Sequence, residues 1–150
     1  YTIVYDHKLI KEQNFIFDLH SKDTYKCLIS NSRTFGFKEE VEYLKERGLI
    51  AGGSLENAIV LDKNGVMNNS KLRHENEFVR HKLLDFIGDI YLSGHRVRGE
   101  FEIFKGGHRL THQLVRSIMS DKSNWNFDTE NTELEELSTP STRNKRELSA

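Results

Sequence analysis

The pattern of apolar and polar residues changes its period along the chain, and this change predicts both strands and helices. Short runs rich in β-branched and aromatic residues are typical of strands, whereas apolar residues three and four apart predict amphipathic helices. The predicted elements are strands at 2–5 and 14–19, a helix from Ser21 through Ile29, a helix that ends at Gly48, a β-hairpin at 58–65, a helix at 76–93, a strand at 101–104 and a helix at 110–119. Their interspersed order predicts an α+β fold, with helices on one face of a modest sheet.

The longest predicted helix, residues 76–93, has one apolar and one polar face. Its polar face carries His81, Lys82, Asp85 and Asp89. His81 and Asp85 are four residues apart, so their side chains project over the same turn, where an imidazole and a carboxylate can hold one metal ion. The pair is only half of a zinc site, because zinc needs a third protein ligand. An isolated pair of this kind is more often simply solvated.

Two further motifs could carry chemistry. In Lys105–Gly106–Gly107–His108, paired glycines predict a tight bend before a helix, where free N–H groups could bind an oxyanion or phosphate. The alternative is an ordinary glycine-rich turn with an exposed His108. The segment 33–37 places a hydroxyl and an aromatic ring before a helix, and core packing of its two phenylalanines is the default. We expect the other five histidines at the surface: His7, His20, His74, His95 and His112.

Composition narrows the class of protein. A chain of 150 residues suits one core, and 22 Lys and Arg against 23 Asp and Glu create no net field that would attract nucleic acid. No apolar run reaches the roughly 20 residues that span a bilayer. Cys27, the single cysteine, lies in an apolar stretch, is expected to be buried, and suits a reducing compartment. Residues 127–150 predict a disordered tail after a folded unit at 1–126, and the absence of an initiator Met is consistent with a piece of a longer protein.

Taken together, several stretches resemble successive motifs of the UDP-3-O-acyl-N-acetylglucosamine deacetylases, the zinc amidases of lipid A biosynthesis in Gram-negative bacteria. The stretches are 33–37, 52–60, 72–82 with Asp85 and Gly88–Asp89, and 105–108. The resemblance covers residues 1–126 and matches only the C-terminal half of that enzyme. It implies the second of two similar domains, each a two-layer β-α-α-β sandwich, with a small βαβ insert at about 38–68 and an active site between the domains.

The resemblance also implies roles for individual residues. Zinc would be held by His81 and Asp85, while a third ligand, a histidine, and the general base, a glutamate, belong to the N-terminal half. The implied catalytic residues are His108, which stabilises the oxyanion or protonates the leaving amine, Asp89, which orients it, and Thr34, which contacts the carbonyl oxygen. The implied substrate-binding residues are Phe35 for the sugar, Lys82 and Lys105 for the diphosphate, and Val41, Ile50, Ala58 and Val60 for the acyl chain. Position 74 is usually aromatic in the family, so His74 is a departure that either adds a competing metal ligand or leaves the chemistry untouched.

These roles predict a cytoplasmic, zinc-dependent enzyme that hydrolyses the N-acetyl amide of UDP-3-O-acyl-N-acetylglucosamine, giving UDP-3-O-acyl-glucosamine and acetate. The N-terminal half would be required as a partner. One alternative is a non-catalytic fragment that folds and binds UDP or an acyl chain without turnover. A second is a plain structural domain with a solvated polar face. The predicted tail is a handle for a protease that controls enzyme level.

Overall fold

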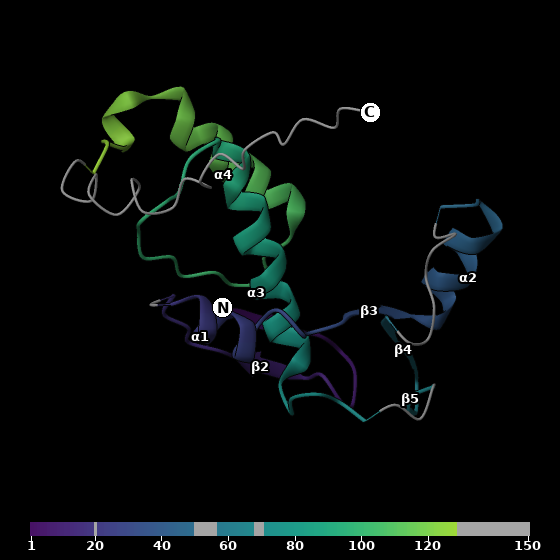
Figure 1. The fold of residues 1–150 in the computed structure, drawn as a ribbon. Helices are drawn as coiled ribbons and strands as arrows, with labels where there is room; N and C mark the ends of the chain where they lie inside the picture. Colours follow the sequence, from purple (N-terminus) through teal and green to yellow (C-terminus); the bar gives the residue numbers. More distant parts are fainter. Residues whose placement is uncertain (20, 50–56, 68–70, 129–150) are drawn as a thin grey trace, which may run out of the picture.

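The computed structural model describes residues 1–19, 21–49, 57–67 and 71–128 of the chain (Figure 1). The strands are β1 (Thr2–Val4), β2 (Glu12–Asn14), β3 (Thr34–Phe37), β4 (Ala58–Asp62) and β5 (Gly65–Val66). The helices are α1 (Lys22–Leu28), α2 (Lys38–Glu46), α3 (Glu77–Ile90) and α4 (His108–Ser120), with short 3-10 turns at Tyr91–Ser93 and Lys122–Asn124. Helices and strands are interspersed along the chain and the strands form two small sheets, so the predicted α+β class is confirmed.

The first sheet pairs β1 with β2 in antiparallel order, with Ile3 opposite Gln13. The predicted strand 101–104 runs alongside β1 but joins it only through one bridge, between Thr2 and Phe104, instead of forming a regular strand. The predicted strand 14–19 was misplaced, since β2 covers Glu12–Asn14 and residues 15–19 form no strand. Asn14 lies opposite Thr2, and Phe15 still exchanges backbone hydrogen bonds with Tyr1 at 2.9 Å in each direction. The residues after Phe15 have no residue of β1 opposite them.

Helix α3 is the central element of the fold, and its two halves pack into two different hydrophobic clusters. Its first half contributes Phe78 and Val79 to a core with strand residues, and its second half packs against α1 and α4. The first cluster comprises Ile3, Ile10, Ile59, Leu61, Phe78 and Val79, and the second Ile29, Leu83, Phe86, Ile90 and Val115. The apolar face predicted from spacing is therefore the buried face, and Gly94, at φ 79°, follows the last turn as predicted.

The second sheet forms a βαβ unit that stands to one side of α3 (Figure 1). Strands β3 and β4 are parallel, with Phe35 opposite Ile59, and α2 lies between them in the chain. Strand β5 returns antiparallel to β4 through the predicted Asn64–Gly65 turn, where the Asp62 carboxylate accepts the backbone N–H groups of both turn residues at 2.7 and 2.9 Å. The unit begins with β3, and the insert boundaries of 38–68 remain a prediction.

Three expectations concern the periphery of the fold. Cys27 is exposed on α1, contrary to prediction, because α1 is short and turns Ile29, just beyond its end, into the core instead. The predicted tail lies almost wholly outside the described residues. Its first two residues, 127 and 128, are described, and Asp128 accepts a hydrogen bond from Arg98 at 3.0 Å. No helix in the described part of the chain is long and apolar enough to span a membrane.

Candidate metal and acid–base site

The polar face of α3 is largely covered. The side chains of His81, Lys82, Asp85 and Asp89 are only 12, 21, 16 and 14% exposed, respectively. The backbone before β3 meets His81 on one side, and the start of α4 meets Asp89 on the other. The face is therefore a partly buried site, and the alternative of a solvated polar face is wrong.

His81 and Asp85 adopt the arrangement expected of two metal ligands. His81 Nε2 lies 3.3 Å from Asp85 Oδ1, and His81 Nδ1 lies 3.2 Å from the carbonyl oxygen of Ser32. A carbonyl oxygen can only accept, so Nδ1 carries the proton and donates it to Ser32. Burial lowers the pKa of His81 by more than the Asp85 carboxylate raises it, which favours the neutral ring.

This protonation state leaves the Nε2 lone pair pointing at a carboxylate oxygen. Two acceptors facing each other are unfavourable unless a cation lies between them, and a backbone carbonyl on the other ring nitrogen is the usual support of a metal-binding histidine. The donor set, one imidazole nitrogen and one carboxylate oxygen, suits zinc. His81 and Asp85 therefore fit a zinc ion, of which they would supply two ligands.

Lys82 connects this pair with Phe35. Its Nζ lies 3.0 Å from Asp85 Oδ2 and 5.5 Å from the ring centroid of Phe35. The Phe35 ring also packs edge-on against Phe78 at 5.0 Å, and its centroid is 6.3 Å from that of His81. Phe35 is thus half in the core and half in the site, so the default of core packing and the predicted site role are both compatible with its position.

A second imidazole–carboxylate pair joins α4 to α3. His108, the first residue of α4, has its Nδ1 2.7 Å from Asp89 Oδ2, and its Nε2 is 3.8 Å from Asp85 Oδ2. The His108 side chain is 59% exposed. The two predicted pairs are therefore adjacent, since His108 stands between the two carboxylates of α3.

The bend before His108 forms differently from the prediction. The residue in the left-handed region is Lys105, at φ 50°, whereas Gly107 is extended at φ 169°. Gly106 is required for close approach instead, because a Cβ there would lie 2.5 Å from Ile103 Cγ2 and 2.6 Å from the Tyr1 hydroxyl oxygen. Burial, followed by the nearby Asp85 charge, raises the pKa of the Tyr1 hydroxyl to about 12.

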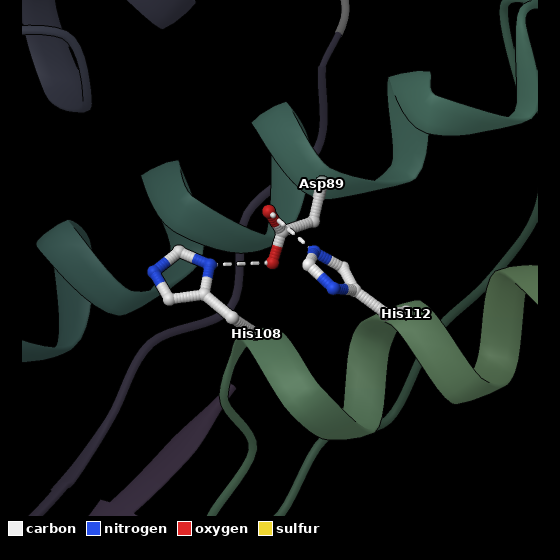
Figure 2. A group of neighbouring side chains, drawn as sticks. All are labelled: Asp89, His108 and His112. Carbon is white, nitrogen blue, oxygen red and sulfur yellow. Dashed lines mark hydrogen bonds and ion pairs between the residues drawn. The ribbon is translucent and has the colours of Figure 1, made fainter.

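His112 belongs to the same cluster and, as predicted, lies at the surface, with a side chain that is 44% exposed. Its Nε2 lies 3.4 Å from Asp89 Oδ1, the carboxylate oxygen that His108 does not use (Figure 2). The sequence signal that could have revealed it is the spacing His108-x-x-x-His112, which puts both rings on one face of a helix.

A buried ion pair between Arg33 and Glu77 joins the residue before β3 to the first turn of α3. It was not predicted from the sequence. The Glu77 side chain is fully buried, and it accepts hydrogen bonds from the Arg33 N–H, Nε and Nη2 and from the Arg73 N–H at 2.7–3.0 Å. Burial would raise the pKa of Glu77, but these donors together lower it. The sequence signal that could have revealed the pair is an acidic residue, Glu77, directly before the apolar residues Phe78 and Val79. This pair fixes the backbone that leads into Thr34 against the first turn of α3.

The remaining predicted residues have separate positions. Ile59 and Leu61 of β4 are fully buried, so Ala58 and Val60 alternate onto the opposite face of the strand. Gly36, opposite Val60, lies on that face, and a Cβ there would be 3.3 Å from Val41 Cγ2. The predicted acyl-chain residues Val41, Ala58 and Val60 thus gather on one side of the second sheet, whereas Ile50 lies outside the described residues.

Thr34, Lys105 and His74 lie at the edges of the site. Thr34 is exposed at the start of β3. Lys105 is exposed, with Nζ 5.3 Å from the centroid of the Phe104 ring. His74 Nε2 lies 3.0 Å from Asn31 Oδ1, and burial lowers the pKa of His74. This contact connects His74 to the loop before Ser32.

The two adjacent pairs, one of metal-ligand type and one an imidazole–carboxylate dyad, contain the kinds of group that metal-dependent hydrolysis uses in general. The model of the family described as LpxC: UDP-3-O-acyl N-acetylglycosamine deacetylase matches residues 1–120, and the chain belongs to this family. The resemblance seen in the sequence is thereby confirmed.

Curated relatives carry the same description. The chain is 48% identical over 125 residues to the UDP-3-O-acyl-N-acetylglucosamine deacetylase of Syntrophus aciditrophicus, covering 83% of this chain and 39% of that protein. It is 46% identical to the same enzyme of Vibrio campbellii (86% and 43%) and 47% identical to that of Stenotrophomonas maltophilia (85% and 42%). The chain thus spans about two fifths of the length of the curated relatives it matches.

Proposed function

We propose that this chain supplies metal ligands and acid–base residues to a cytoplasmic deacetylase. Its reaction is zinc-dependent hydrolysis of the N-acetyl amide of UDP-3-O-acyl-N-acetylglucosamine, which yields UDP-3-O-acyl-glucosamine and acetate. The observation that carries the proposal is the His81–Asp85 pair, whose facing acceptor atoms call for a cation, with the His108–Asp89 pair directly beside it. Membership of the deacetylase family supports the choice of reaction.

The residues of the chain divide the work between them. When bound, zinc lowers the pKa of a water molecule and polarises the amide carbonyl. Asp89 accepts from His108 Nδ1 and so directs His108 Nε2 toward the Asp85 side, where it can give a proton to the leaving amine or stabilise the oxyanion. Thr34 offers a hydroxyl donor at the start of β3. The Arg33–Glu77 pair keeps that strand in place against α3.

Substrate binding is assigned to the surfaces around these pairs. The exposed part of the Phe35 ring stacks on the sugar, and Lys82 and Lys105 bind the diphosphate. The acyl chain lies along Val41, Ala58 and Val60, with Ile50 as a further contact, and each buried CH₂ contributes about 0.8 kcal/mol.

The third zinc ligand and the general base come from the N-terminal half of the enzyme, the partner that the chain requires. This requirement also motivates a second candidate function, a module that binds UDP or acyl chains without turnover. The supporting observation is that His81 and Asp85 are two ligands where catalytic zinc has three.

The tail at 127–150 is proposed as a handle for a protease that controls enzyme level. Deleting it should lengthen the cellular half-life of the enzyme with unchanged turnover of substrate. An unchanged half-life refutes this role.

Zinc-dependent acetate release tests the proposal. The longer natural protein that carries this chain, or the chain mixed with its N-terminal half, should release acetate from the nucleotide substrate and lose this activity in His81→Ala. His95→Ala, which removes an exposed histidine outside the cluster, is the matched control. Activity that survives His81→Ala would refute the assignment. Titration of the chain alone with UDP, followed by NMR near Phe35 and Lys105, tests the second candidate, which an unchanged spectrum rejects.

A further inference from the structure

We propose that His7 is a positioning residue for the acyl chain of the substrate. It fixes the β4–β5 hairpin, and with it the strand face that the acyl chain contacts, to the loop between β1 and β2. The inference rests on the proposed function for the identity of the bound chain. It is carried by the contacts of the His7 ring, whose Nε2 reaches a residue 55 positions away in the sequence.

Both nitrogens of the His7 ring make a contact. Nε2 lies 2.8 Å from the backbone carbonyl oxygen of Asp62, the last residue of β4. The Leu9 N–H donates to Nδ1 at 3.3 Å. A carbonyl oxygen can only accept, so the proton of the neutral ring is on Nε2, and Nδ1 is the acceptor. The two contacts therefore require the same tautomer, and together they hold the ring between the loop and the hairpin.

The loop that carries His7, residues 5–11, is closed by its own backbone hydrogen bonds. The Tyr5 N–H donates to the carbonyl oxygen of Lys11 at 2.9 Å. The His7 carbonyl oxygen accepts from the N–H groups of Ile10 and Lys11 at 3.2 and 2.9 Å. Ile10 is 2% exposed and belongs to the same hydrophobic cluster as Ile59 of β4. The His7 ring is thus attached to a loop that is anchored in the core.

The hairpin has a defined shape at the point where His7 meets it. The Asp62 carboxylate accepts the N–H groups of Asn64 and Gly65, while the Asp62 backbone carbonyl accepts from His7. Asp62 therefore closes the turn with its side chain and joins it to the loop with its main chain. Leu9 also lies against this turn, because its Cδ1 would be 3.6 Å from a Cβ at Gly65.

The loop supports the second sheet on the face opposite the predicted acyl-chain residues. The His7 and Phe37 ring centroids are 5.6 Å apart, and Tyr5 packs against Phe35 and Phe37 at 5.6 and 6.1 Å. Phe35 and Phe37 share one face of β3 and pack against the first hydrophobic cluster. Gly36, between them, lies on the other face, toward Val41. The position of the acyl-binding face thus depends on how the loop holds the sheet from the opposite side.

Loss of the His7 contacts should loosen the hairpin without unfolding it. The apolar contacts of Ile10 with Ile59 and Leu61 would still hold the sheet to the core. The acyl chain would then meet a face that has to be ordered on binding, which costs affinity. A contact that is equally strong in the bound substrate and in the transition state changes KM and leaves kcat unchanged. We therefore expect His7 to act on KM, and only for substrates with a long acyl chain.

Three variants of the longer natural protein that carries this chain test this role. His7→Phe keeps a ring against Phe37 but can neither donate to Asp62 nor accept from Leu9. His7→Gln restores an amide donor and an acceptor oxygen. His95→Phe makes the same exchange at an exposed histidine far from the hairpin in sequence. Circular dichroism verifies that each variant is folded. Hydrogen exchange of the 58–66 segment reports on the hairpin, and acetate release is measured with substrates that carry either a long acyl chain or an acetyl group.

For His7→Phe we expect faster exchange at 58–66 and a KM for the long-chain substrate that is raised about two- to tenfold, the range given by the net contribution of one hydrogen bond. The kcat, and the KM for the acetyl substrate, should stay within about twofold of wild type on the same grounds. His7→Gln should recover part of both effects, and His95→Phe should show neither.

Two results would overturn the role of His7. Unchanged exchange at 58–66 in both His7 variants would show that the ring does not fix the hairpin. An equal rise in KM for both substrates would show that it does not act through the acyl chain. Wild type that releases no acetate would instead overturn the deacetylase proposal, and the exchange experiment distinguishes this failure because it requires no turnover.

Discussion

The His81–Asp85 and His108–Asp89 pairs contain the same two functional groups, yet α3 holds the first inside the fold while α4 presents the second to solvent. The His81 side chain is 12% exposed and that of His108 is 59% exposed. Ser32 fixes Nδ1 of His81 with a backbone carbonyl, whereas Asp89 takes Nδ1 of His108 with a carboxylate. The two pairs therefore lie in different environments: the imidazole of the first pair is largely buried, and the imidazole of the second pair faces solvent.

Helix α3 thereby supports two kinds of chemistry. A buried, neutral imidazole with one nitrogen fixed by a carbonyl is a good ligand, because its remaining lone pair has a fixed direction. An exposed imidazole held by a carboxylate keeps a second nitrogen that can exchange protons with a bound molecule. The burial of the ring and the group that Nδ1 contacts thus decide whether such a histidine suits metal binding or acid–base chemistry.

Alanine substitutions in the active, longer protein should show the largest effect of this division. We expect His81→Ala to lose both activity and bound zinc, and His108→Ala to lower kcat by about 10²–10⁴-fold while zinc at the first pair is retained. Steady-state kinetics and metal analysis after dialysis at equimolar zinc measure the two effects. Equal loss of zinc in both variants would contradict the division.

Glu77→Gln should be the most damaging substitution for stability on the His81 side. It leaves the buried Arg33 without its counter-charge, and breaking such a pair typically costs about 3–5 kcal/mol. Urea unfolding measures the loss, with exposed Glu75→Gln as the control. NMR of the folded variant should show changes at Ser32 and His81 and little change at His108. An effect on His108 as large as that on His81 would argue against separate supports.

Gly106→Ala should disturb the other side of the site, where the bend before α4 positions His108. The added Cβ meets Ile103 and the Tyr1 hydroxyl at 2.5–2.6 Å, and overpacking of this kind typically costs about 1–3 kcal/mol. Gly107→Ala is a matched control, because its backbone is extended and nothing lies within 4 Å of an added Cβ. We expect thermal unfolding and the His108 ring signals to change in the first variant only. Equal destabilisation by both would show that flexibility, rather than close approach, requires these glycines.

The smallest expected effect is a pH dependence of stability on the His81 side. The hydrogen bonds that outweigh burial lower the pKa of Glu77 in the folded state, so its contribution is complete above the ordinary glutamate pKa of about 4.3. That contribution is lost as the pH falls through the lower, folded-state pKa. Denaturant unfolding from pH 7 to 3 should show a steeper acid loss for wild type than for Glu77→Gln. Parallel profiles would contradict the prediction.

Most elements of this fold could be predicted from local patterns. The apolar spacing of α3, the Ser21 N-cap, which accepts from the Thr24 N–H at 3.1 Å, and the Asn64–Gly65 turn all depend on neighbours within a few residues. The errors occurred where pairing with a distant segment decides the outcome. Residues 14–19 and 101–104 have strand-like composition, but a strand also needs a partner in register.

Taken alone, the sequence determined the helical element that carries His81 and Asp85, the spacing of that pair, and the family to which the chain belongs. Three contacts became visible only in the folded chain: that of Ser32 with His81, which sets the protonation state of the ring, the Glu77–Arg33 pair, and the contact of His112 with Asp89. These contacts join residues far apart in the chain. Helix geometry sets contacts between residues four apart, whereas the contact of His112 with Asp89 exists only because α4 packs against α3.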